Sequence, residues 1–330
     1  MGAATAVSVA PDSRPPSPDP DVSVLVPAKD EAGNLALFME LAEASFREHP
    51  GVSFEVVVVD DGSEDDTWAT LVGLAERYPF LRLARHRSQR GIADALRTGY
   101  LAARGRVLVF YPADLQFKPE DIPRLVAPIL ADEADMVTGF KQGEYDKAFV
   151  SGIYNRLSRS LFDVKVKDLN SVKAYRREIM DNLPVRPDWH RYMIVIAAAQ
   201  GFTVTEIPVP LYPRHAGKSK FATWRRIPIG VLDMLSVWFE LRFGQKPLLL
   251  FGMTGAGLFG AGFLLGLGAL VWLVATGQGL RAVWTVVQTC LILGSVFFAA
   301  GLVGEQVAAQ RAELREIRRR LEEMAARRRD

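Results

Sequence analysis

Short apolar runs alternate with longer amphipathic stretches along the first third of the chain. Four of the runs are typical of strands, and they lie at 22–27, 54–60, 81–86 and 107–111. Helical periodicity fills the intervals between them. Strands that alternate with helices in this way predict βαβ units and a mostly parallel sheet. Because the strands are continuously Val-rich, we expect the sheet to be buried on both faces.

Polar residues gather where these strands end. They are Lys29, Asp30 and Glu31 after the first strand, Asp60 and Asp61 after the second, and Asp114 and Gln116 after the fourth. Ligands of open α/β sheets bind beyond the carboxyl ends of the strands, so this edge is the predicted site. The sequence has neither a glycine-rich dinucleotide turn after the first strand nor a P-loop. The acids suit a divalent cation, or a base and a ribose, although each one singly also suits a helix N-cap.

The last third of the chain contains two long uncharged runs, at 247–279 and 282–304, separated by Arg281. Each run is long enough to cross a hydrocarbon core of ~30 Å as a helix, which takes about 20 residues. We therefore expect a two-helix transmembrane hairpin over 247–304 in a lipid bilayer, in preference to a buried hairpin of a soluble domain. Arginine and lysine flank the hairpin outside its loop. This bias predicts that the domain over 21–220 and both termini are cytoplasmic.

Composition divides the remainder of the chain. Residues 1–20 are typical of a disordered leader, and no apolar signal segment precedes the first strand. Residues 221–246 mix aromatic side chains with arginine, which favours amphipathic helices in the membrane interface, or else a helix packed on the domain. Residues 305–330 are a predicted cytoplasmic basic helix. The single cysteine, Cys290, excludes an intramolecular disulfide and a cysteine-based zinc site. We expect no nucleic-acid partner.

Five segments in order resemble one known family. They are VPAKDEAGNL, VVVVDDGSEDDT, RGIADALRTGYLAARGRVLVFYPADLQFKPEDIPRL, VKDLNSVKAYRRE and EIPVPLYPRHAGKSKF. Over about residues 22–304 the chain resembles the polyprenyl-phosphate glycosyltransferases of glycosyltransferase family 2. The resemblance implies an α/β GT-A domain, which is Rossmann-like, and inverting transfer of a hexose from a UDP- or GDP-sugar to undecaprenyl or dolichyl phosphate on the cytoplasmic face. It also implies Mg²⁺ or Mn²⁺ as cofactor.

Residue by residue, the resemblance implies nucleotide-sugar contacts at Pro27, Lys29, Glu31, Asp61, Ala113, Asp114 and Gln116. Asp61 is the implied contact to the base. Asp114 and Gln116 are the implied metal residues, and Asp114 is the implied catalytic residue. The family's Asp-Ala-Asp-Leu-Gln motif falls on 112–116, so that Pro112 replaces its first acid. Lys29 stands where the family usually has tyrosine.

A basic segment, PRHAGKSKF, lies directly before the membrane region. Its position and the resemblance imply that the acceptor or the diphosphate is bound by Lys141, Lys147, Arg214, Ser219 and Lys220. The alternative is a solvated basic loop, or contact with anionic headgroups worth about 1 kcal/mol per charge near the surface. Three further residues, His190, Arg191 and Asp168, are interpreted either as functional or as structural.

The sequence is compatible with two functions of different classes. The first is an enzyme that attaches a sugar to a lipid phosphate. The alternative is a catalytically impaired membrane scaffold that binds a nucleotide sugar, because Pro112 removes an acid from the metal motif. A processive polysaccharide synthase is disfavoured because the sequence lacks a QxxRW motif and a larger membrane part. The sugar and the base are left open.

The tail predicts association into a homo-oligomer, and the resemblance implies a tetramer. An a/d seam after the second apolar run includes Val307, Leu314, Ile317, Leu321 and Met324. A single amphipathic helix on the membrane surface is the alternative. The first apolar run also has small faces for close helix packing, at Gly252, Gly255, Gly262 and Gly266. These glycines suit either packing between chains or packing within the hairpin.

Overall fold

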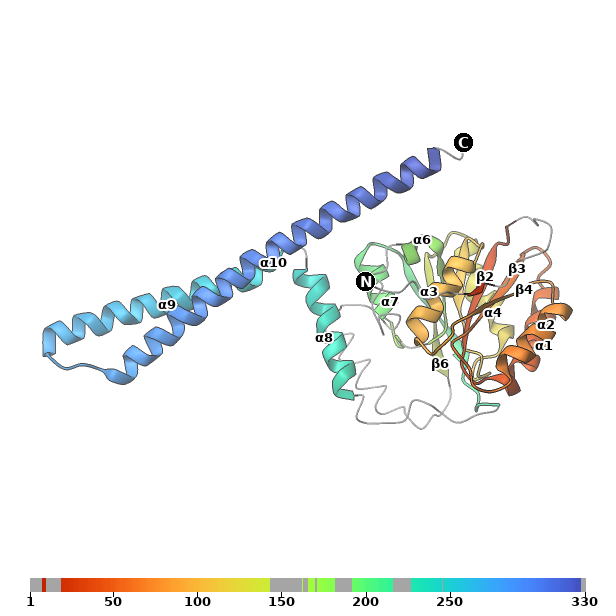
Figure 1. Ribbon diagram of the computed structural model, residues 1–330, viewed down its shortest axis with the longest axis horizontal. Coiled ribbons are helices and arrows are strands. Elements are labelled where there is room, and N and C mark those ends of the chain that lie inside the picture. Colours follow the sequence, from red (N-terminus) through yellow and green to blue (C-terminus); the bar gives the residue numbers. More distant parts are fainter. Residues whose placement is uncertain are drawn as a thin grey trace. The chain divides into compact units, whose positions relative to one another are not determined.

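The structure is a computed structural model that describes residues 8–9, 19–142, 162, 166–169, 171–181, 192–215, 227–244 and 246–327. The chain divides into two compact units, 1–234 and 235–330. Figure 1 shows the elements of both units as a ribbon, coloured along the sequence.

Strands and helices alternate through the first unit. In chain order the elements are β1 (Ser8–Val9), β2 (Val22–Ala28), α1 (Ala32–Arg47), β3 (Phe54–Asp60), α2 (Thr67–Arg77), β4 (Leu81–Arg85), α3 (Ile92–Ala102), β5 (Val107–Phe110), the 3₁₀ turn η1 (Pro119–Asp121), α4 (Ile122–Leu130), β6 (Met136–Gln142), β7 (Lys173–Arg176), α6 (Arg177–Asp181), α7 (Met193–Ala199) and β8 (Val204–Pro210). The four predicted strands correspond to β2, β3, β4 and β5. The two residues of β1 fall within the segment that was expected to be a leader.

The strands form one mixed sheet of eight, in the order β1-β4-β3-β2-β5-β7-β6-β8. β2 pairs in parallel with β3 and with β5, β3 with β4, and β6 with β8. β7 is antiparallel to both of its neighbours, β5 and β6, and β1 is antiparallel to β4. The prediction of a mostly parallel α/β sheet is confirmed.

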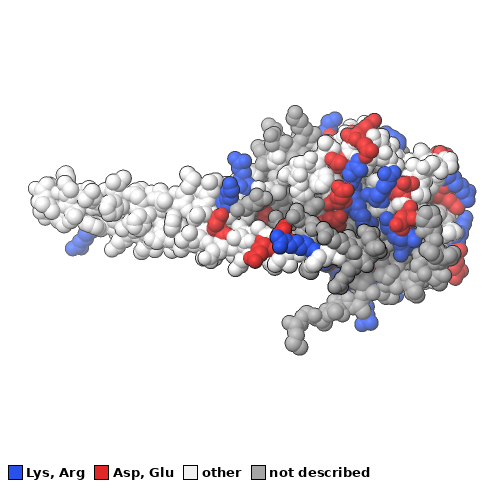
Figure 2. Space-filling model, turned by 90° about the horizontal axis from the view of Figure 1, so that it is seen from above, with Lys and Arg blue, Asp and Glu red and all other residues white. Residues whose placement is uncertain are grey.

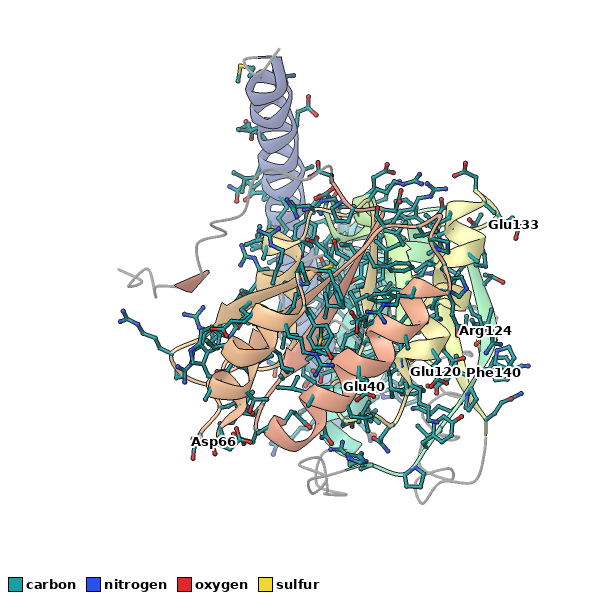
Figure 3. The ribbon with its side chains drawn as sticks, turned by 90° about the vertical axis from the view of Figure 1, so that its right-hand side faces the viewer. Glu40, Asp66, Glu120, Arg124, Glu133 and Phe140 are labelled. Carbon is teal, nitrogen blue, oxygen red and sulfur yellow. The ribbon has the colours of Figure 1, made fainter. Side chains whose placement is uncertain are left out.

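Both faces of the central strands are buried. Val24 and Val26 of β2 lie in one core cluster with Phe38 of α1. Leu25, between them in sequence, lies in a second cluster with Leu96 of α3. Figure 3 looks onto the first of these layers, and Glu40 and Arg124, labelled there on α1 and α4, are exposed on its outer side. Burial on both faces accounts for the continuous apolar runs of the sequence.

Three helices follow the sheet, namely α8 (Ile227–Phe243), α9 (Pro247–Thr276) and α10 (Arg281–Arg327). α9 and α10 are long and apolar enough to cross a membrane, since each contains an 18-residue window of high mean hydropathy, 2.2 within Pro247–Thr276 and 2.1 within Arg281–Leu314. Figure 2 shows the hairpin surface almost without charged side chains over most of its length. α10 continues without a break into the segment predicted as the basic helix. The apolar side chains of α8 are not confined to one face, since Leu232 and Leu235 are exposed whereas Met234 and Val237 are buried.

The small faces of α9 pack against α10. A Cβ atom at Gly255 would lie 2.5 Å from the main-chain nitrogen of Phe298, and one at Gly294 would lie 2.6 Å from that of Phe259. At Gly262 the added atom would lie 2.8 Å from Cβ of Cys290. The two helix backbones therefore approach each other where side chains are missing, as small residues permit in membranes. Of the two uses left open by the sequence, these glycines serve the hairpin.

Candidate functional site

The carboxyl ends of β2, β3 and β5 meet at one edge of the sheet. Ala28, the last residue of β2, pairs with Asp60, the last residue of β3, and the Asp61 N–H donates to the Ala28 carbonyl at 2.8 Å. The Tyr111 N–H donates to the Leu25 carbonyl at 3.0 Å, which carries the end of β5 to the same edge. The structure thus brings the three predicted polar groups together.

The residues after β2 are tied to the turn after β3. Lys29 Nζ donates to the Gly62 carbonyl at 2.7 Å and lies 3.4 Å from Glu64 Oε1. Asp30 has a positive φ of 51°, its N–H donates to Ser63 Oγ at 2.9 Å, and its Oδ1 accepts the Glu64 N–H at 2.9 Å. These bonds fix two predicted contact residues, Lys29 and Glu31, on one rigid rim, since the Glu31 N–H also donates to Thr67 Oγ1 at 2.8 Å.

Asp61 is buried and is surrounded by donors. One carboxylate oxygen accepts the Arg90 N–H at 2.8 Å and the other accepts the Gly91 N–H at 2.8 Å. His86 Nδ1 lies 2.7 Å from Asp61 Oδ1, and His86 Nε2 lies 2.8 Å from Thr98 Oγ1. An ionised carboxylate only accepts hydrogen bonds, so Nδ1 must be the protonated nitrogen. His86 was missed by the sequence analysis, and its only signal is a titratable side chain directly after a buried strand.

Asp114 lies in the turn that leads out of β5. The residue is 6% exposed, and its Oδ1 accepts the Gln116 N–H at 3.2 Å. Leu115 between them has a positive φ of 57°, which marks a tight turn. Burial raises the pKa of Asp114, and Arg214 together with the Gln116 N–H opposes that rise. Ala113 is buried beside it.

Arg214 lies against Asp114, although the two residues are far apart in the sequence. Its Nη2 atom lies 2.8 Å from Asp114 Oδ2. The segment after β8 is tethered to the turn after β5, because the Tyr212 N–H donates to the Gln116 carbonyl at 2.9 Å. Lys118 Nζ also lies 4.5 Å from the centre of the Tyr212 ring. The tether places a predicted acceptor residue, Arg214, directly on the predicted metal residue.

Lys141, near the end of β6, is paired with Asp168. Lys141 Nζ lies 3.2 Å from Asp168 Oδ2, and both side chains are largely buried. The Lys167 N–H donates to Glu206 Oε1 at 2.5 Å, which holds this segment against β8. The other predicted basic-site residues, Lys147, Ser219 and Lys220, lie outside the described residues, as do His190 and Arg191.

A buried lysine, Lys173, is a further residue that the sequence analysis missed. It begins β7, opposite Phe110 of β5, and is 1% exposed. Its Nζ donates to the Ser171 carbonyl at 2.8 Å and lies 5.8 Å from the centre of the Phe110 ring. The sequence of β7, KAYR, is short and has a basic residue at each end, so no local pattern distinguishes Lys173. Lys173 therefore lies beside the last residue of β5 in the sheet.

The arrangement fits a divalent cation that is shared with a substrate. Across the described ranges, no three or more histidine, cysteine, aspartate and glutamate side chains are grouped closely enough to hold a metal ion. Mg²⁺, however, commonly takes one or two protein carboxylates and completes its shell with water and phosphate oxygens. Asp114 can supply the one carboxylate, and the Gln116 side chain lies two residues further along the same turn.

The chain matches a known protein family and several known proteins. The profile of Glycosyl transferase family 2 matches residues 23–186. Over 303 residues the chain is 30% identical to dodecaprenyl-phosphate galacturonate synthase of Rhizobium johnstonii, an alignment that covers 87% of this chain and 88% of the relative. The chain belongs to glycosyl transferase family 2. Because the match to the Rhizobium protein spans nearly its whole length, this transferase is a polyprenyl-phosphate glycosyltransferase, and the prediction of an enzyme is confirmed.

Two further comparisons concern a second relative and the fold of the transferase. It is 28% identical over 306 residues to undecaprenyl-phosphate 4-deoxy-4-formamido-L-arabinose transferase of Pseudomonas fluorescens, covering 91% of this chain and 88% of the relative. Glucosyl-3-phosphoglycerate synthase of Mycobacterium tuberculosis, solved with Mn²⁺, UDP and glucosyl-3-phosphoglycerate, superposes with a TM-score of 0.51 at 18% identity. That match covers 67% of this chain and 80% of the synthase. The predicted GT-A fold is confirmed.

Proposed function

We propose that the transferase moves a hexose from a nucleotide-diphosphate sugar to undecaprenyl or dolichyl phosphate, with inversion, at the cytoplasmic face of a membrane. The observation that carries the proposal is the buried Asp114 carboxylate, with the Arg214 guanidinium 2.8 Å away, at the carboxyl edge of the sheet. A carboxylate can bind a metal ion, and a guanidinium beside it can bind a phosphate. The pair therefore suits a ligand that consists of a divalent cation and a diphosphate.

The rim after β2 and β3 is the proposed nucleotide site, with Pro27, Lys29 and Glu31 on one side and Asp61 below the base. Three donors already fix the Asp61 carboxylate, which has room for about four. The remaining lone pair suits a ring N–H, which both uracil and guanine present. This lone pair thus suits the UDP- or GDP-sugar that the family resemblance implies.

Asp114 and Gln116 are the proposed protein ligands of Mg²⁺ or Mn²⁺, and Ala113 is the proposed contact beside them. When bound, the cation neutralises charge on the departing diphosphate. Mn²⁺ or Mg²⁺ accompanies UDP in structures of the mycobacterial synthase, which has the same fold. Arg214 lies beside Asp114 and adds a second positive group for the same diphosphate.

The acceptor phosphate is its own nucleophile. Its second pKa lies near ~6, so that an oxygen is largely ionised at neutral pH and needs no general base. Direct attack by this oxygen at the anomeric carbon breaks the bond to the diphosphate and inverts the carbon. Lys141 is the proposed cation for the acceptor within the described residues, together with Lys147, Ser219 and Lys220 beyond them.

The membrane hairpin supports a lipid-linked acceptor. α9 lies within the uncharged run at 247–279 and α10 contains the run at 282–304, and each helix is long and apolar enough to cross a membrane. Basic residues flank them outside the loop, which favours both termini and the first unit on the cytoplasmic side. A soluble nucleotide sugar and a membrane-held phosphate then meet in one compartment.

Purified full-length protein, assayed with a panel of UDP- and GDP-sugars against undecaprenyl and dolichyl phosphates, tests the proposal. We expect one donor to give a lipid-linked hexose of inverted configuration, with turnover that stops in excess chelator. A retained configuration, or a sugar that is not a hexose, would correct the corresponding part. Full turnover in excess chelator would remove the metal.

A further inference from the structure

The Asp114 carboxylate is already paired with the guanidinium of Arg214. Arg214 Nη2 lies 2.8 Å from Oδ2, and the Gln116 N–H donates to Oδ1 at 3.2 Å. Both oxygens of this buried group therefore face donors of the protein itself. The pair with Arg214 carries no net charge, so a divalent cation arriving from solution gains little attraction from it and must displace the guanidinium.

Two other acids of the proposed site, Asp61 and Asp168, already face donors of the protein. Pro112 stands where the family motif has its first acid. Asp61 accepts three hydrogen bonds, and Asp168 faces Lys141 at 3.2 Å. Among the residues that the structure describes, no larger cluster of metal-ligating side chains exists. The protein alone is therefore a poor binder of a divalent cation.

A nucleoside diphosphate would supply new partners both for the divalent cation and for Arg214. Its phosphate oxygens supply the ligands that Mg²⁺ or Mn²⁺ requires. The same diphosphate is a new anion for Arg214, and guanidinium groups bind phosphate through paired hydrogen bonds. The Arg214 side chain is 25% exposed, and the tether of its segment runs through the main chain of Tyr212. Its guanidinium can therefore turn from Asp114 to a phosphate without breaking that tether.

We propose that Arg214 makes cation binding conditional on the nucleotide. It holds Asp114 until a nucleoside diphosphate binds, and it then turns to the diphosphate and leaves Asp114 to the cation. This inference rests on the proposed function and concerns the coupling between two ligands of the same site. Because coupling of equilibrium affinities is reciprocal, the cation must strengthen nucleotide binding by the same factor by which the nucleotide strengthens cation binding.

Replacing Arg214 gives a signature that simple damage to the site does not. Arg214→Gln removes the competitor of the cation, so Mn²⁺ alone should bind more tightly. It also removes a partner of the diphosphate, so the nucleotide should bind more weakly. A structural defect would weaken both. Pro112→Asp, which restores an acid, should likewise strengthen the binding of Mn²⁺ alone.

The experiment uses the full chain in detergent micelles. Mn²⁺ binding without nucleotide is followed by electron paramagnetic resonance, and UDP and GDP binding by calorimetry with and without Mn²⁺. For the wild type we expect Mn²⁺ to raise nucleotide affinity about 10-fold or more, within the usual range of coupling between sites. Arg214→Gln should bind Mn²⁺ alone more tightly and show weaker coupling. Arg124→Gln is the charge-matched control and should behave as wild type. Arg124 is an exposed residue of α4, and its Nη1 lies 2.7 Å from Asp121 Oδ1.

Two results would overturn the proposal. One is Mn²⁺ binding to the wild type that is equally tight with and without nucleotide, and the other is an unchanged or lower affinity of Arg214→Gln for Mn²⁺ alone. Sugar transfer by the same preparation keeps the two proposals apart. Transfer without coupling overturns only this inference, whereas coupling without transfer of any hexose overturns only the proposed function.

Discussion

His86 Nδ1 lies 2.7 Å from Asp61 Oδ1, in the interior of the protein and 25 residues along the chain. The same carboxylate accepts the N–H groups of Arg90 and Gly91, so this histidine and this aspartate together hold the segment between β4 and α3. Gly62 fits beneath that segment, where a Cβ atom would lie 2.6 Å from the Ser88 carbonyl carbon. The contact joins the loop after β3 to the segment between β4 and α3 at the proposed nucleotide site.

Removing this histidine should weaken nucleotide binding. His86→Ala removes one hydrogen-bond partner from each of the buried Asp61 and Thr98 side chains, at a cost of about 1–3 kcal/mol in the free energy of unfolding. We expect the KM for the sugar nucleotide to rise more than kcat falls, because the change disturbs the nucleotide rim. His86→Asn, which keeps a donor, should recover part of the KM, and Thr98→Val, which removes only the outer hydrogen bond, should have the smaller effect. Equal KM values for all variants would show that the contact serves stability alone.

Asp114→Asn should separate activity from stability. The neutral amide cannot hold a cation against the diphosphate, so we expect kcat/KM to fall by at least about 100-fold. Burial raises the pKa of Asp114, which means that the fold disfavours its charged form. The same variant should therefore unfold at a temperature equal to or above that of the wild type at neutral pH. Loss of activity together with a lower unfolding temperature would contradict this assignment.

The pKa of Asp135 is shifted in the opposite direction from that of Asp114. The Thr203 N–H donates to its Oδ2 at 2.8 Å and Arg176 Nε lies 2.9 Å from its Oδ1, and these contacts hold the pKa of Asp135 below the ordinary value of 3.8. A lowered pKa stabilises the fold at pH values above 3.8, and that stability is lost as the pH falls through the folded-state pKa. Asp135→Asn should therefore destabilise the first unit at neutral pH but not at the acidic end. Unfolding followed against pH, with Asp114→Asn in parallel, checks both signs.

Lys141 and Asp168 should behave as a pair. Asp168→Asn removes the carboxylate that lies 3.2 Å from Lys141 Nζ, whereas Lys141→Met removes the lysine and leaves the largely buried Asp168 without this ion pair. We expect Lys141→Met to raise the KM for polyprenyl phosphate more than that for the sugar nucleotide, and the double variant to recover stability but not the lipid KM. Full recovery of the lipid KM in the double variant would show that Lys141 only neutralises Asp168.

The helix hairpin can be tested with two glycines of the same helix. Gly255→Leu would place its Cβ atom 2.5 Å from the Phe298 main-chain nitrogen and should separate α9 from α10, whereas an added Cβ atom at Gly260 meets nothing within 4 Å, so Gly260→Leu is the control. We expect the first variant to lose folded protein in detergent and the second to match wild type, as measured by monodisperse yield and thermal unfolding. Similar behaviour of both variants would contradict the observed packing.

The tail is the remaining candidate for assembly, because the glycine faces are used inside the hairpin. Val307, Leu314, Ile317 and Met324 are at least 40% exposed on α10, as an unpartnered seam requires. Truncation after Glu305 should lower the oligomeric state, measured by light scattering in mild detergent. It also removes Arg311, which lies 3.2 Å from Glu240, and Arg311→Gln controls for that loss because it keeps the seam. An unchanged mass on truncation would place the interface elsewhere.

The sequence by itself determined the first half of the sheet. The Val-rich runs became β2 and β3 at the predicted residues, within one residue, because a strand buried on both faces must be apolar throughout. The collection of Lys29, Asp61 and Asp114 at one edge also followed from the sequence, since parallel strands end together. The two apolar helices needed only their length and lack of charge.

The tertiary structure alone decided which distant residues meet. No local pattern indicates that β7 enters the sheet antiparallel between β5 and β6, and this insertion is what brings Lys173 opposite Phe110, the last residue of β5. Likewise, the sequence placed Arg214 with the acceptor, and only the tether through Tyr212 shows it against Asp114. Periodicity reports which face of an element is buried, whereas pairings across a hundred residues depend on how the chain folds back on itself. The chemistry of this site lies in those pairings.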